Sequence, residues 1–431
     1  MKNLLSASPT ILYITNGYPL EAKDMFSGDD YSFLVKEPWQ VVILPRLKPA
    51  QETQASPEIL PPVDQCLLAS RYTKITALLH PDALPLLKRE AITCVGQKAP
   101  FLFFEALKSI GIALQARNAL RSCILSRGLQ HTPLVAYFFW FSPAVVGAWL
   151  LRREFPHLRI VTRLHGGDLF PHQSLGGYLP FRFQRVDMAD VYAPCSQRGT
   201  DFLANEGVAA KKLTCAYLGV PPVKALASAT PGDEMQLLSC SFTAPVKRLP
   251  LMAQSLLAFA ARHSHVALHW RHVGDGPQLE ALKATADAAP PNLICTFHGG
   301  MSVDESREFF QGMQTGGLDG LINVSESEGL PVSMMEAQMA GLPVIGTDVG
   351  GVSEIVRPDT GILLPKDFTQ DQFDSAVLRL RDWKKTEIRE HIAQKASDRF
   401  SLDNYKNFID EALWPQMRLS QAILEGAAPS R

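Results

Sequence analysis

The sequence predicts an α/β protein with two doubly wound domains that face a central cleft. Three observations support this prediction. A chain of 431 residues is longer than one ordinary hydrophobic core requires, which favours two domains. Short apolar runs typical of buried parallel strands alternate with helix-like stretches in both halves. Residues 223–235, rich in Ala, Ser, Pro and Gly, lose the apolar period and separate the halves as a linker would.

The first predicted domain, residues 1–222, contains five strand-like apolar runs, each followed by a loop or a helix-like stretch. These runs are residues 10–15, 40–45, 133–138, 159–162 and 190–193. The longest apolar block, residues 133–156, is interrupted by Pro143 and carries two arginines near its end. We therefore interpret it as a strand followed by a buried helix, and we expect no membrane-spanning helix in the chain.

The second predicted domain, residues 236–400, shows a more regular alternation. The strand-like segments LLSCSF, HVALHWRHVG, LICTFHG and GLINVS are separated by the helix-like segments LMAQSLLAFAAR, PQLEALKATADAA and VDESREFFQGM. Right-handed crossovers between such strands produce a parallel sheet with helices on both faces. The last segment, residues 401–431, is predicted to be helical.

The net charge argues against a nucleic-acid partner, and the cysteine pattern favours a cytoplasmic location. The chain has 42 Lys and Arg against 43 Asp and Glu, so no basic excess indicates a nucleic-acid partner. Its 7 cysteines are scattered without a CxxC pair, which is typical of reduced thiols in a cytoplasm. The N-terminal MKNLLSASPTILYIT has only a short, interrupted apolar run, so we expect no signal peptide. Together these features favour a cytoplasmic protein with a small-molecule ligand.

The segment NVSESEGLPVSMMEAQMAGLPVIGTDVGGVSEIV, residues 323–356, is the strongest candidate site. The preceding strand leads to the carboxyl edge of its sheet, where open α/β sheets bind ligands, and residues 325–330 form the loop there. Pro331 suits the first position of the helix that follows, and Gly341 suits its end. The segment therefore predicts a strand, a binding loop and a helix whose start lies at the ligand edge.

Two glutamates flank the start of this helix. Glu328 directly precedes it and Glu336 lies about a turn and a half inside, so both could hydrogen-bond hydroxyl groups beside a bound phosphate. Unpaired N–H groups and the positive end of the helix dipole suit a diphosphate. The residues at this helix start are Gly329, Leu330, Pro331 and Val332. From spacing alone, two solvated glutamates on a surface helix remain the alternative.

Resemblance to a known family adds to this prediction. The run EGLPVSMME, followed by AGLPVIGTDVGGVSEIV, resembles the E-x7-E signature of the GT4 family of retaining glycosyltransferases. WRHVGDGPQLEAL and SCSFTAPVKRLPLMAQSL resemble that family's nucleotide-site and diphosphate-binding segments, while RLHGGDLF, QSLGGYLPFRF and APCSQRGTDFL resemble members that build bacterial exopolysaccharides, capsules and O-antigens. The resemblance covers nearly the whole chain and is weakest over residues 46–132.

The resemblance implies the GT-B fold, in which two Rossmann-like domains face a cleft. The first domain, residues 1–222, would bind the acceptor, and residues 236–400 would bind the nucleotide-sugar donor. Residues 401–431 would form helices that cross back to the first domain. The activity that the resemblance implies is the transfer of a hexosyl group to a glycan with retention of the anomeric configuration.

The family's donor-binding roles map onto residues of the second domain. By resemblance, Glu328 contacts the hydroxyls of the donor sugar, Glu336 binds the nucleotide ribose and Lys247 neutralises the diphosphate. Arg248 could assist Lys247. Phe242 departs from the family, whose members often have an arginine at this position, so the diphosphate either relies on Arg248 or is bound more weakly. A solvated surface pair is the alternative interpretation of the two cations.

Further roles map onto the loops of both domains. His165 in RLHGGD matches the histidine near the reacting carbon of the donor sugar, and Asp168 either orients the acceptor or caps the next turn. Gly17 lies where the family has a glycine loop against the diphosphate. Contact with the nucleotide base is assigned to His298 and Gly299.

The chemistry implied by the resemblance is front-face attack, in which the leaving phosphate deprotonates the acceptor hydroxyl. Lysine and helix N–H groups would stabilise the departing nucleotide diphosphate, so we expect neither a metal nor another cofactor. Glu328 then binds the donor and does not act as a nucleophile. We find no D-x-D pair that would hold a metal between phosphates.

The expected partners are a UDP- or GDP-linked sugar and a glycan or lipid-linked oligosaccharide, with no nucleic acid. Residues 101–128 carry four basic side chains between apolar residues and could lie on an anionic membrane surface. These basic residues are Lys108, Arg117, Arg121 and Arg127. We therefore expect a cytoplasmic protein. For residues 101–128, peripheral contact at the inner face of the membrane and an ordinary domain surface are both open.

Two other functions share this scaffold. A nucleotide-sugar 2-epimerase needs additional acid and base carboxylates, and the E-x7-E and RLHGGD matches argue against it. A degenerate GT-B protein that only binds a glycan or a partner protein is supported by Phe242. The intact residues Glu328, Glu336, Lys247 and His165 oppose that second alternative.

Overall fold

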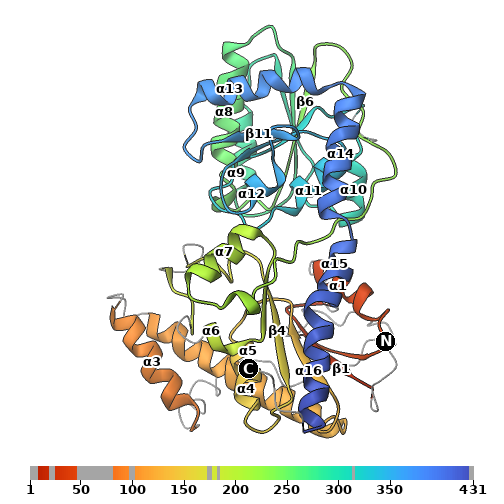
Figure 1. Cartoon of the computed structure of the whole chain (residues 1–431). Helices are drawn as coiled ribbons and strands as arrows, with labels where there is room; N and C mark the ends of the chain where they lie inside the picture. The colour runs from red at the N-terminus through yellow and green to blue at the C-terminus, as the bar shows by residue number, and fades with distance from the viewer. Residues whose placement is uncertain are drawn as a thin grey trace. The chain divides into compact units, whose positions relative to one another are not determined.

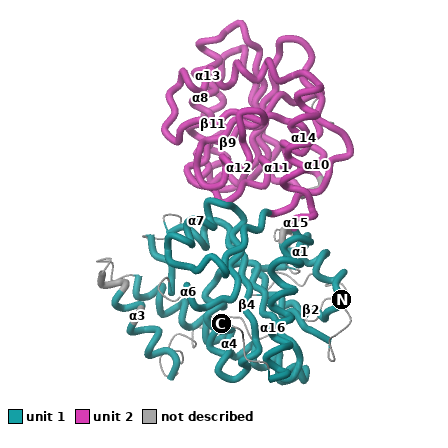
Figure 2. Tube along the Cα trace, in the orientation of Figure 1, with its two compact units in different colours: residues 1–217, 405–431 teal, residues 218–404 magenta. Residues whose placement is uncertain are grey.

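A computed structural model describes residues 8–18, 25–45, 81–96, 102–171, 177–181, 185–312 and 316–426. The chain divides into two compact units, shown in separate colours in Figure 2. The first comprises Met1–Tyr217 and Tyr405–Arg431, and the second comprises Leu218–Asn404. Each unit is built around one parallel sheet, as the sequence predicts, so the expected fold class of two Rossmann-like α/β units is confirmed.

The sheet of the first unit has the strand order β2-β1-β3-β4-β5, and all of its strand pairs are parallel. Its strands are β1 (Thr10–Thr15), β2 (Gln40–Pro45), β3 (Leu134–Phe138), β4 (Arg159–Leu164) and β5 (Val191–Pro194). All five predicted strands of the first half form. Strands β1, β3 and β5 are buried along their whole length, as parallel strands covered on both faces require.

Helices cover this sheet (Figure 1). They are α1 (Met25–Leu34), α3 (Ala83–Gly96), α4 (Leu102–Ser126), α5 (Ala144–Leu151), α6 (Arg185–Met188) and α7 (Gln197–Asn205). The apolar block around Pro143 folds into β3 and the buried helix α5, as predicted. Gly147 allows α5 to approach α4 closely, because a Cβ there would lie 2.3 Å from the Ala113 carbonyl oxygen.

The C-terminal helices belong to the first unit. They are α15 (Asp403–Phe408), a π-helical turn (Ile409–Leu413) and α16 (Trp414–Leu424). Helix α16 packs against β3 and β4, where the Ser420 hydroxyl accepts a 2.8 Å hydrogen bond from the Leu134 N–H. The Trp414 ring packs on Trp39 with 4.7 Å between ring centroids. These contacts fasten the end of the chain to its first sheet.

The sheet of the second unit has the strand order β11-β10-β9-β6-β7-β8 and is also parallel. Its strands are β6 (Met235–Cys240), β7 (Leu268–Val273), β8 (Leu293–Phe297), β9 (Gly320–Asn323), β10 (Val344–Thr347) and β11 (Gly361–Leu364). Around it lie α8 (Leu249–Arg262), α9 (Leu279–Ala286), α10 (Val303–Phe310), α11 (Val332–Met339), α12 (Val352–Ile355), α13 (Gln370–Arg379) and α14 (Thr386–Phe400). The strand order reverses beside β6, so β6 and β9 lie at the switch point where such sheets bind ligands.

Helix ends in the second unit follow the sequence signals, with one correction. Ser302 and Glu305 form a capping box at the start of α10. Gly341, at φ +77°, follows the end of α11, as predicted. Pro331 is not the first helical residue, because its ψ of 110° is extended and α11 begins at Val332. The predicted helix start was therefore wrong by one residue.

No helix among the described residues is long and apolar enough to cross a membrane.

Candidate active site

The loop after β9 carries the E-x7-E segment at the carboxyl edge of the second sheet. Two hydrogen bonds hold its first turn: the Ser325 N–H donates to the Asn323 side chain (2.9 Å), and the Thr347 hydroxyl donates to the Ser325 carbonyl (2.7 Å). The neighbouring loop after β10 braces it, because a Cβ on Gly350 would lie 1.8 Å from the Glu328 carbonyl oxygen. Only glycine therefore permits this approach, at a φ of +53°.

Lys247 and Glu328 form the centre of the candidate site. The Lys247 Nζ lies 2.7 Å from Glu328 Oε1, although the two residues are 81 positions apart. Glu328 Oε1 also accepts a 3.1 Å hydrogen bond from the Asn323 amide. The Lys247 side chain is 24% exposed and the Glu328 side chain only 8%, so the lysine reaches the surface while the carboxylate is buried. An ammonium group and a carboxylate are thus placed together beside the start of α11.

Arg248 holds the loop that carries Glu328. Its guanidinium donates to the carbonyls of Val324 (2.6 Å) and Ser325 (3.2 Å). Its backbone is left-handed, with φ 48° and ψ 36°, and it caps α8. Burial lowers the pKa of Arg248, with Glu326 acting in the opposite direction. In this structure Arg248 therefore braces the loop backbone, while Lys247 points to the carboxylate.

Glu336 projects from α11 toward α10. The Arg307 Nε lies 3.3 Å from Glu336 Oε1, and the two side chains are 22% and 14% exposed. Cys240, at the end of β6, is influenced by both groups: burial and Glu336 raise the pKa of its thiol to about 12, while Lys247 opposes the rise. Glu336 and Lys247 therefore lie within electrostatic reach of the same residue at this edge.

The predicted base-binding residues follow β8. The His298 N–H donates to the His272 carbonyl (2.9 Å), and the Gly299 carbonyl accepts from the Gly274 N–H (2.8 Å). The His298 ring packs on Phe309, with 4.7 Å between centroids, and burial lowers its pKa. These bonds join the loops after β7 and β8. Contact of His298 and Gly299 with a base remains a prediction.

Phe242 lies in the loop after β6, where the family often has arginine. Its side chain is 55% exposed, and its ring approaches Gly276, where a Cβ would lie 2.9 Å from a ring carbon. The φ of Gly276 is +137°, so a side chain there would be strained as well as crowded. The phenylalanine thus covers the glycine loop after β7 without supplying a positive charge.

In the first unit, His165 and Asp168 share the turn after β4. The Asp168 carboxylate accepts hydrogen bonds from the backbone N–H of His165 (2.8 Å) and of Phe141 (3.0 Å). Of the two roles considered for Asp168, these bonds match capping of the turn. The His165 Nδ1 lies 3.8 Å from Asp168 Oδ2, beyond hydrogen-bonding distance.

The His165 ring is held by aromatic packing. Its centroid lies 4.2 Å from that of Trp140 and 4.9 Å from that of Phe139. The residue is 9% exposed, and neither ring nitrogen has a hydrogen-bond partner among the described residues. Gly17 is buried in the loop after β1, where the Thr15 hydroxyl donates to the Tyr18 carbonyl (2.6 Å). The first unit therefore presents an oriented imidazole with unused polar atoms.

Three residues that contribute to this geometry have no assigned role in the sequence prediction. Asn323 shares Glu328 with Lys247, Arg307 pairs with Glu336, and Gly350 permits the loop contact. Asn323 and Gly350 lie inside the segment 323–356, so their position in that segment could have marked them as site residues. Arg307 lies on an ordinary amphipathic helix, and nothing in its local sequence indicates a role in the site. Asp24 and Phe26 resemble an acidic-x-Phe feature of the polysaccharide-building members, which implies contact with the acceptor, and both side chains lie outside the described residues.

Comparison with known proteins agrees with the fold and with a glycosyltransferase activity. Residues 236–382 match the family model of glycosyl transferases group 1. A putative colanic acid biosynthesis glycosyltransferase WcaL of Salmonella typhimurium is 25% identical over 296 residues, which are 65% of this chain and 71% of the relative. The corresponding WcaL of Escherichia coli is 27% identical over 282 residues, 61% of this chain and 66% of the relative.

Solved structures share the fold over almost the whole chain. A lipopolysaccharide outer core galactosyltransferase, WaaB, has a TM-score of 0.65 at 16% identity and covers 94% of this chain and 99% of its own. Anabaena HepE in complex with UDP has a TM-score of 0.62 at 14% identity and covers 94% of this chain and 100% of its own. The chain therefore has the GT-B fold of these glycosyltransferases, and its second unit is similar to the glycosyl transferases group 1 over residues 236–382.

Proposed function

We propose that this protein is a retaining glycosyltransferase that moves a sugar from a nucleotide-sugar to a glycan acceptor during bacterial surface polysaccharide synthesis. The Lys247–Glu328 pair beside the start of α11 is the observation that carries the proposal. The WcaL relatives are named for colanic acid biosynthesis, and HepE structures contain UDP and UDP-glucose. These names support a UDP-sugar as the first donor to test, with a GDP-sugar as the second.

In the proposed complex the donor diphosphate lies between Lys247 and the start of α11. The ammonium group neutralises phosphate charge, and the unpaired N–H groups of the helix start supply hydrogen bonds. Glu328, released from part of its pairing with Lys247, accepts hydrogen bonds from the sugar hydroxyls. Glu336 binds the ribose diol from the next turn of the helix. In this arrangement the positive and N–H groups face phosphate oxygens, and the two carboxylates face hydroxyl groups.

The proposed reaction breaks the bond between the anomeric carbon and the terminal phosphate oxygen. The acceptor oxygen forms its bond to the same face of that carbon, and its proton passes to the departing phosphate. Lys247 stabilises the negative charge that develops on the leaving group, so we propose no metal and no cofactor. Glu328 serves as a binding group, because its Oε1 already accepts hydrogen bonds from Lys247 and Asn323.

His165 is the proposed first-unit contribution to the donor sugar. Its buried ring nitrogens have no partner among the described residues, and an unpaired buried polar group is unfavourable until a ligand or water satisfies it. Trp140 and Phe139 hold the ring in place, which fixes the direction of any hydrogen bond it makes. Asp168 shapes the turn and acts through His165.

We further propose a lipid-linked acceptor and peripheral contact at the cytoplasmic face of the membrane. The basic residues Lys108, Arg117 and Arg121 of α4 and Arg127 just after it give this contact limited support, because the three on α4 lie near carboxylates. Lys108 pairs with Glu105 (3.4 Å), Arg121 with Glu154 (2.7 Å) and Arg117 lies 4.0 Å from Asp82. Flotation of the protein with vesicles containing anionic lipid tests this contact, and recovery only in the unbound fraction would reject it.

A donor screen tests the transferase itself. We expect one sugar nucleotide among UDP-glucose, UDP-galactose, UDP-N-acetylglucosamine and GDP-mannose to be hydrolysed slowly without acceptor. Glu328→Ala should lower that rate about 100-fold, whereas the exposed His391→Gln should leave it unchanged. Retention predicts that the anomeric configuration of the donor persists in the product, which NMR reports directly. Failure of every donor to bind or turn over would favour a binding-only GT-B protein.

A further inference from the structure

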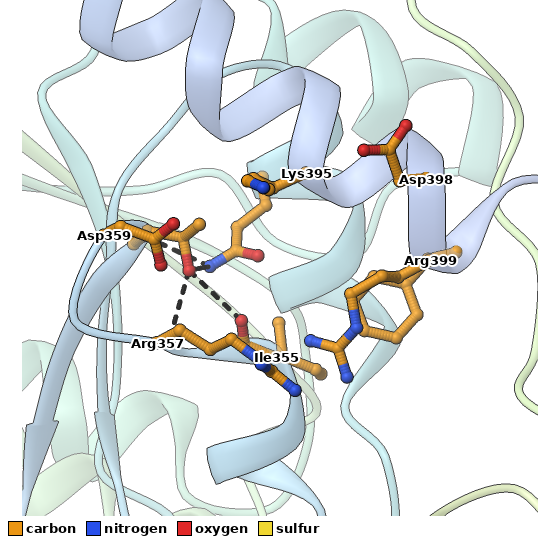
Figure 3. Close-up of a pocket in the computed structure, with 9 residues that line it drawn as sticks. Ile355, Arg357, Asp359, Lys395, Asp398 and Arg399 are labelled. Carbon is orange, nitrogen blue, oxygen red and sulfur yellow. Dashed lines mark hydrogen bonds between the residues drawn. The ribbon is translucent and has the colours of Figure 1, made fainter.

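The second unit contains a pocket away from the donor loop, shown in Figure 3. It lies between the end of α12, the connection to β11 and the last turns of α14, and has a volume of about 230 Å³. Its lining residues are Gln338, Ile355, Arg357, Asp359, Thr360, Lys395, Asp398, Arg399 and Phe400. None of the predicted donor-binding residues contributes to it. The connection leads to the start of β11, whereas the donor loop follows the end of β9.

Hydrogen bonds between protein groups fix one wall of this pocket before any ligand binds. The Gln338 amide, on a residue only 1% exposed, donates to the carbonyl and hydroxyl oxygens of Thr360, both at 3.1 Å. The Thr360 hydroxyl donates to the Ile355 carbonyl (3.2 Å) and accepts from the Arg357 N–H (3.1 Å). Figure 3 draws these bonds as dashed lines, two of which reach the labelled residues Ile355 and Arg357. The wall therefore keeps its shape without a ligand.

Positive charge is only partly neutralised in the pocket. Asp359 is hydrogen-bonded to His391 (3.0 Å), which lowers the pKa of the carboxyl, and Asp398 accepts from Gln394 (2.7 Å). Among the described residues neither Arg357 nor Lys395 forms an ion pair within 4.0 Å, although Lys395 is close enough to contribute to the lowered pKa of Asp359. Both of these cations are exposed at the pocket wall. They are available to an incoming anion.

Arg399 supplies a third cation in a fixed position. Its guanidinium donates to the Glu354 carbonyl and lies 5.0 Å from the centre of the Phe400 ring. It comes from α14, as Lys395 does, while Arg357 comes from the connection opposite. Cations therefore enter the pocket from two separate elements, as a tetrahedral anion with several oxygens requires.

We propose that this pocket is a second ligand site, which binds the phosphoryl group of a small molecule between Arg357, Lys395 and Arg399. Its volume is several times the roughly 30 Å³ that one water occupies, so a phosphoryl group and a further polar group fit. Asp359 and Asp398 would accept hydroxyl hydrogens and repel a ligand that carries additional negative charge. Inorganic phosphate and a sugar monophosphate both satisfy this chemistry.

A ligand bound in this pocket would also stabilise the last turn of α14, near the end of the second unit. The Phe400 carbonyl accepts a 2.7 Å hydrogen bond from the Val220 N–H, which ties the last turn of α14 to the segment where this unit begins. A ligand held by Lys395 and Arg399 bridges that turn to the α12–β11 connection. We therefore expect binding to slow hydrogen exchange in the last turn of α14.

Calorimetric titration of the full chain tests the site with inorganic phosphate, glucose 1-phosphate, glucose 6-phosphate and glucose. Because phosphate could also enter the donor site, the titrations use Lys247→Met as the background. We expect at least one phosphorylated probe to bind and glucose not to bind. Adding Arg357→Ala and Lys395→Ala should weaken that binding by about tenfold or more, whereas adding Lys283→Ala, which removes an exposed lysine on α9, should not.

The outcomes separate the possible sources and the two sites. Equal binding of inorganic phosphate and the sugar phosphates assigns the site to phosphate, and tighter binding of a sugar phosphate assigns it to that class. Absence of binding, or binding that survives Arg357→Ala and Lys395→Ala, overturns the proposal. The same pair of substitutions in the native background should leave UDP affinity unchanged, so failure here is distinguishable from failure of the donor site.

Discussion

Two oppositely charged pairs, one in each unit, show how differently the molecule uses charge. Arg163 and Asp30 are both 0% exposed in the first unit, with Nη2 and Oδ1 4.0 Å apart. Lys247 and Glu328 are 24% and 8% exposed at the sheet edge of the second unit, with Nζ and Oε1 2.7 Å apart. The buried pair has the longer distance, so proximity alone does not distinguish their roles.

Protein groups surround Arg163 on every side. It donates to the Tyr137 hydroxyl (2.9 Å) and the Ala216 carbonyl (3.1 Å), and its guanidinium lies 4.3 Å from the centre of the Phe408 ring. Burial alone would lower the pKa of Arg163, but Tyr137 and Asp30 outweigh it and raise the pKa overall. Ala216 and Phe408 adjoin the two places where the chain leaves and re-enters this unit. Arg163 therefore joins those segments inside one core.

The comparison indicates which charges are available to a ligand. Removing one member of a fully buried pair leaves an uncompensated charge, so such a pair holds a structure together. A partly exposed pair contributes little to stability, and a charged ligand can replace one partner at small cost. We therefore propose that Arg163 has a structural role and that Lys247 binds the donor, and four predictions test this contrast.

The largest effect is expected from Arg163→Met. The substitution removes both hydrogen bonds and leaves Asp30 without its cation, so it should lower the free energy of unfolding by about 3 to 5 kcal/mol. Urea denaturation followed by near-ultraviolet circular dichroism measures the loss. Lys283→Met, at a lysine that is 44% exposed and paired with the exposed Glu280, is the control and should change stability by less than about 1 kcal/mol. If the two substitutions lowered stability equally, the buried pair would not differ in role from an exposed one.

Lys247→Met should lower activity and leave stability almost unchanged, the opposite of Arg163→Met. We expect kcat/KM for the donor to fall about 10²- to 10³-fold, because the departing diphosphate loses its cation, while the melting temperature changes little. Steady-state nucleotide release and a thermal melt of the same sample provide both readouts. Lys366→Met, at an exposed lysine paired with Glu326 of the same loop, should leave kcat/KM unchanged. A large loss of stability without loss of rate would place Lys247 in the structural class.

His272 tests a third case, a buried group that stays neutral. Burial, with a smaller contribution from His298, lowers its pKa from 6.5 to about 4. The unfolded chain therefore takes up a proton between about pH 6.5 and pH 4 that the folded protein does not. The stabilisation is fully present above pH 6.5 and is lost as the pH falls toward 4, by about 3 kcal/mol.

Chemical denaturation between pH 7.5 and pH 4 measures that loss. His272→Asn should flatten the acid limb, whereas His391→Gln, at an exposed histidine, should not. An unchanged acid limb in His272→Asn would show that other groups control the pH dependence.

The smallest effect is expected at Glu336. Glu336→Gln keeps the shape of the side chain but weakens its hydrogen bonds to a ribose diol, so nucleotide affinity should fall about tenfold. Isothermal titration with UDP measures the change. Glu326→Gln, at an exposed glutamate on the donor loop, is the control. If Glu336→Gln binds UDP as the unmodified protein does, the role of Glu336 is limited to its ion pair with Arg307.

Local patterns predicted much of the architecture. The five strands of the first half and the strand and helix around Pro143 appear where the sequence indicates. The start of α11 was displaced by one residue, because Pro331 adopts an extended ψ and serves as the cap. Such errors are expected at helix ends, where one dihedral angle decides the boundary. The candidate donor loop was also located from sequence, since it follows a buried strand.

The sequence by itself determined the alternation of strands and helices, the position of the E-x7-E loop and the family resemblance. Each depends on residues close together in the chain, whose periodicity sets local backbone hydrogen bonding. The tertiary structure alone decided that Lys247 meets Glu328, that Arg307 meets Glu336 and that Arg163 is enclosed with Asp30. These partners come from separate elements, and only the packing of whole strands and helices sets the distances between their side chains.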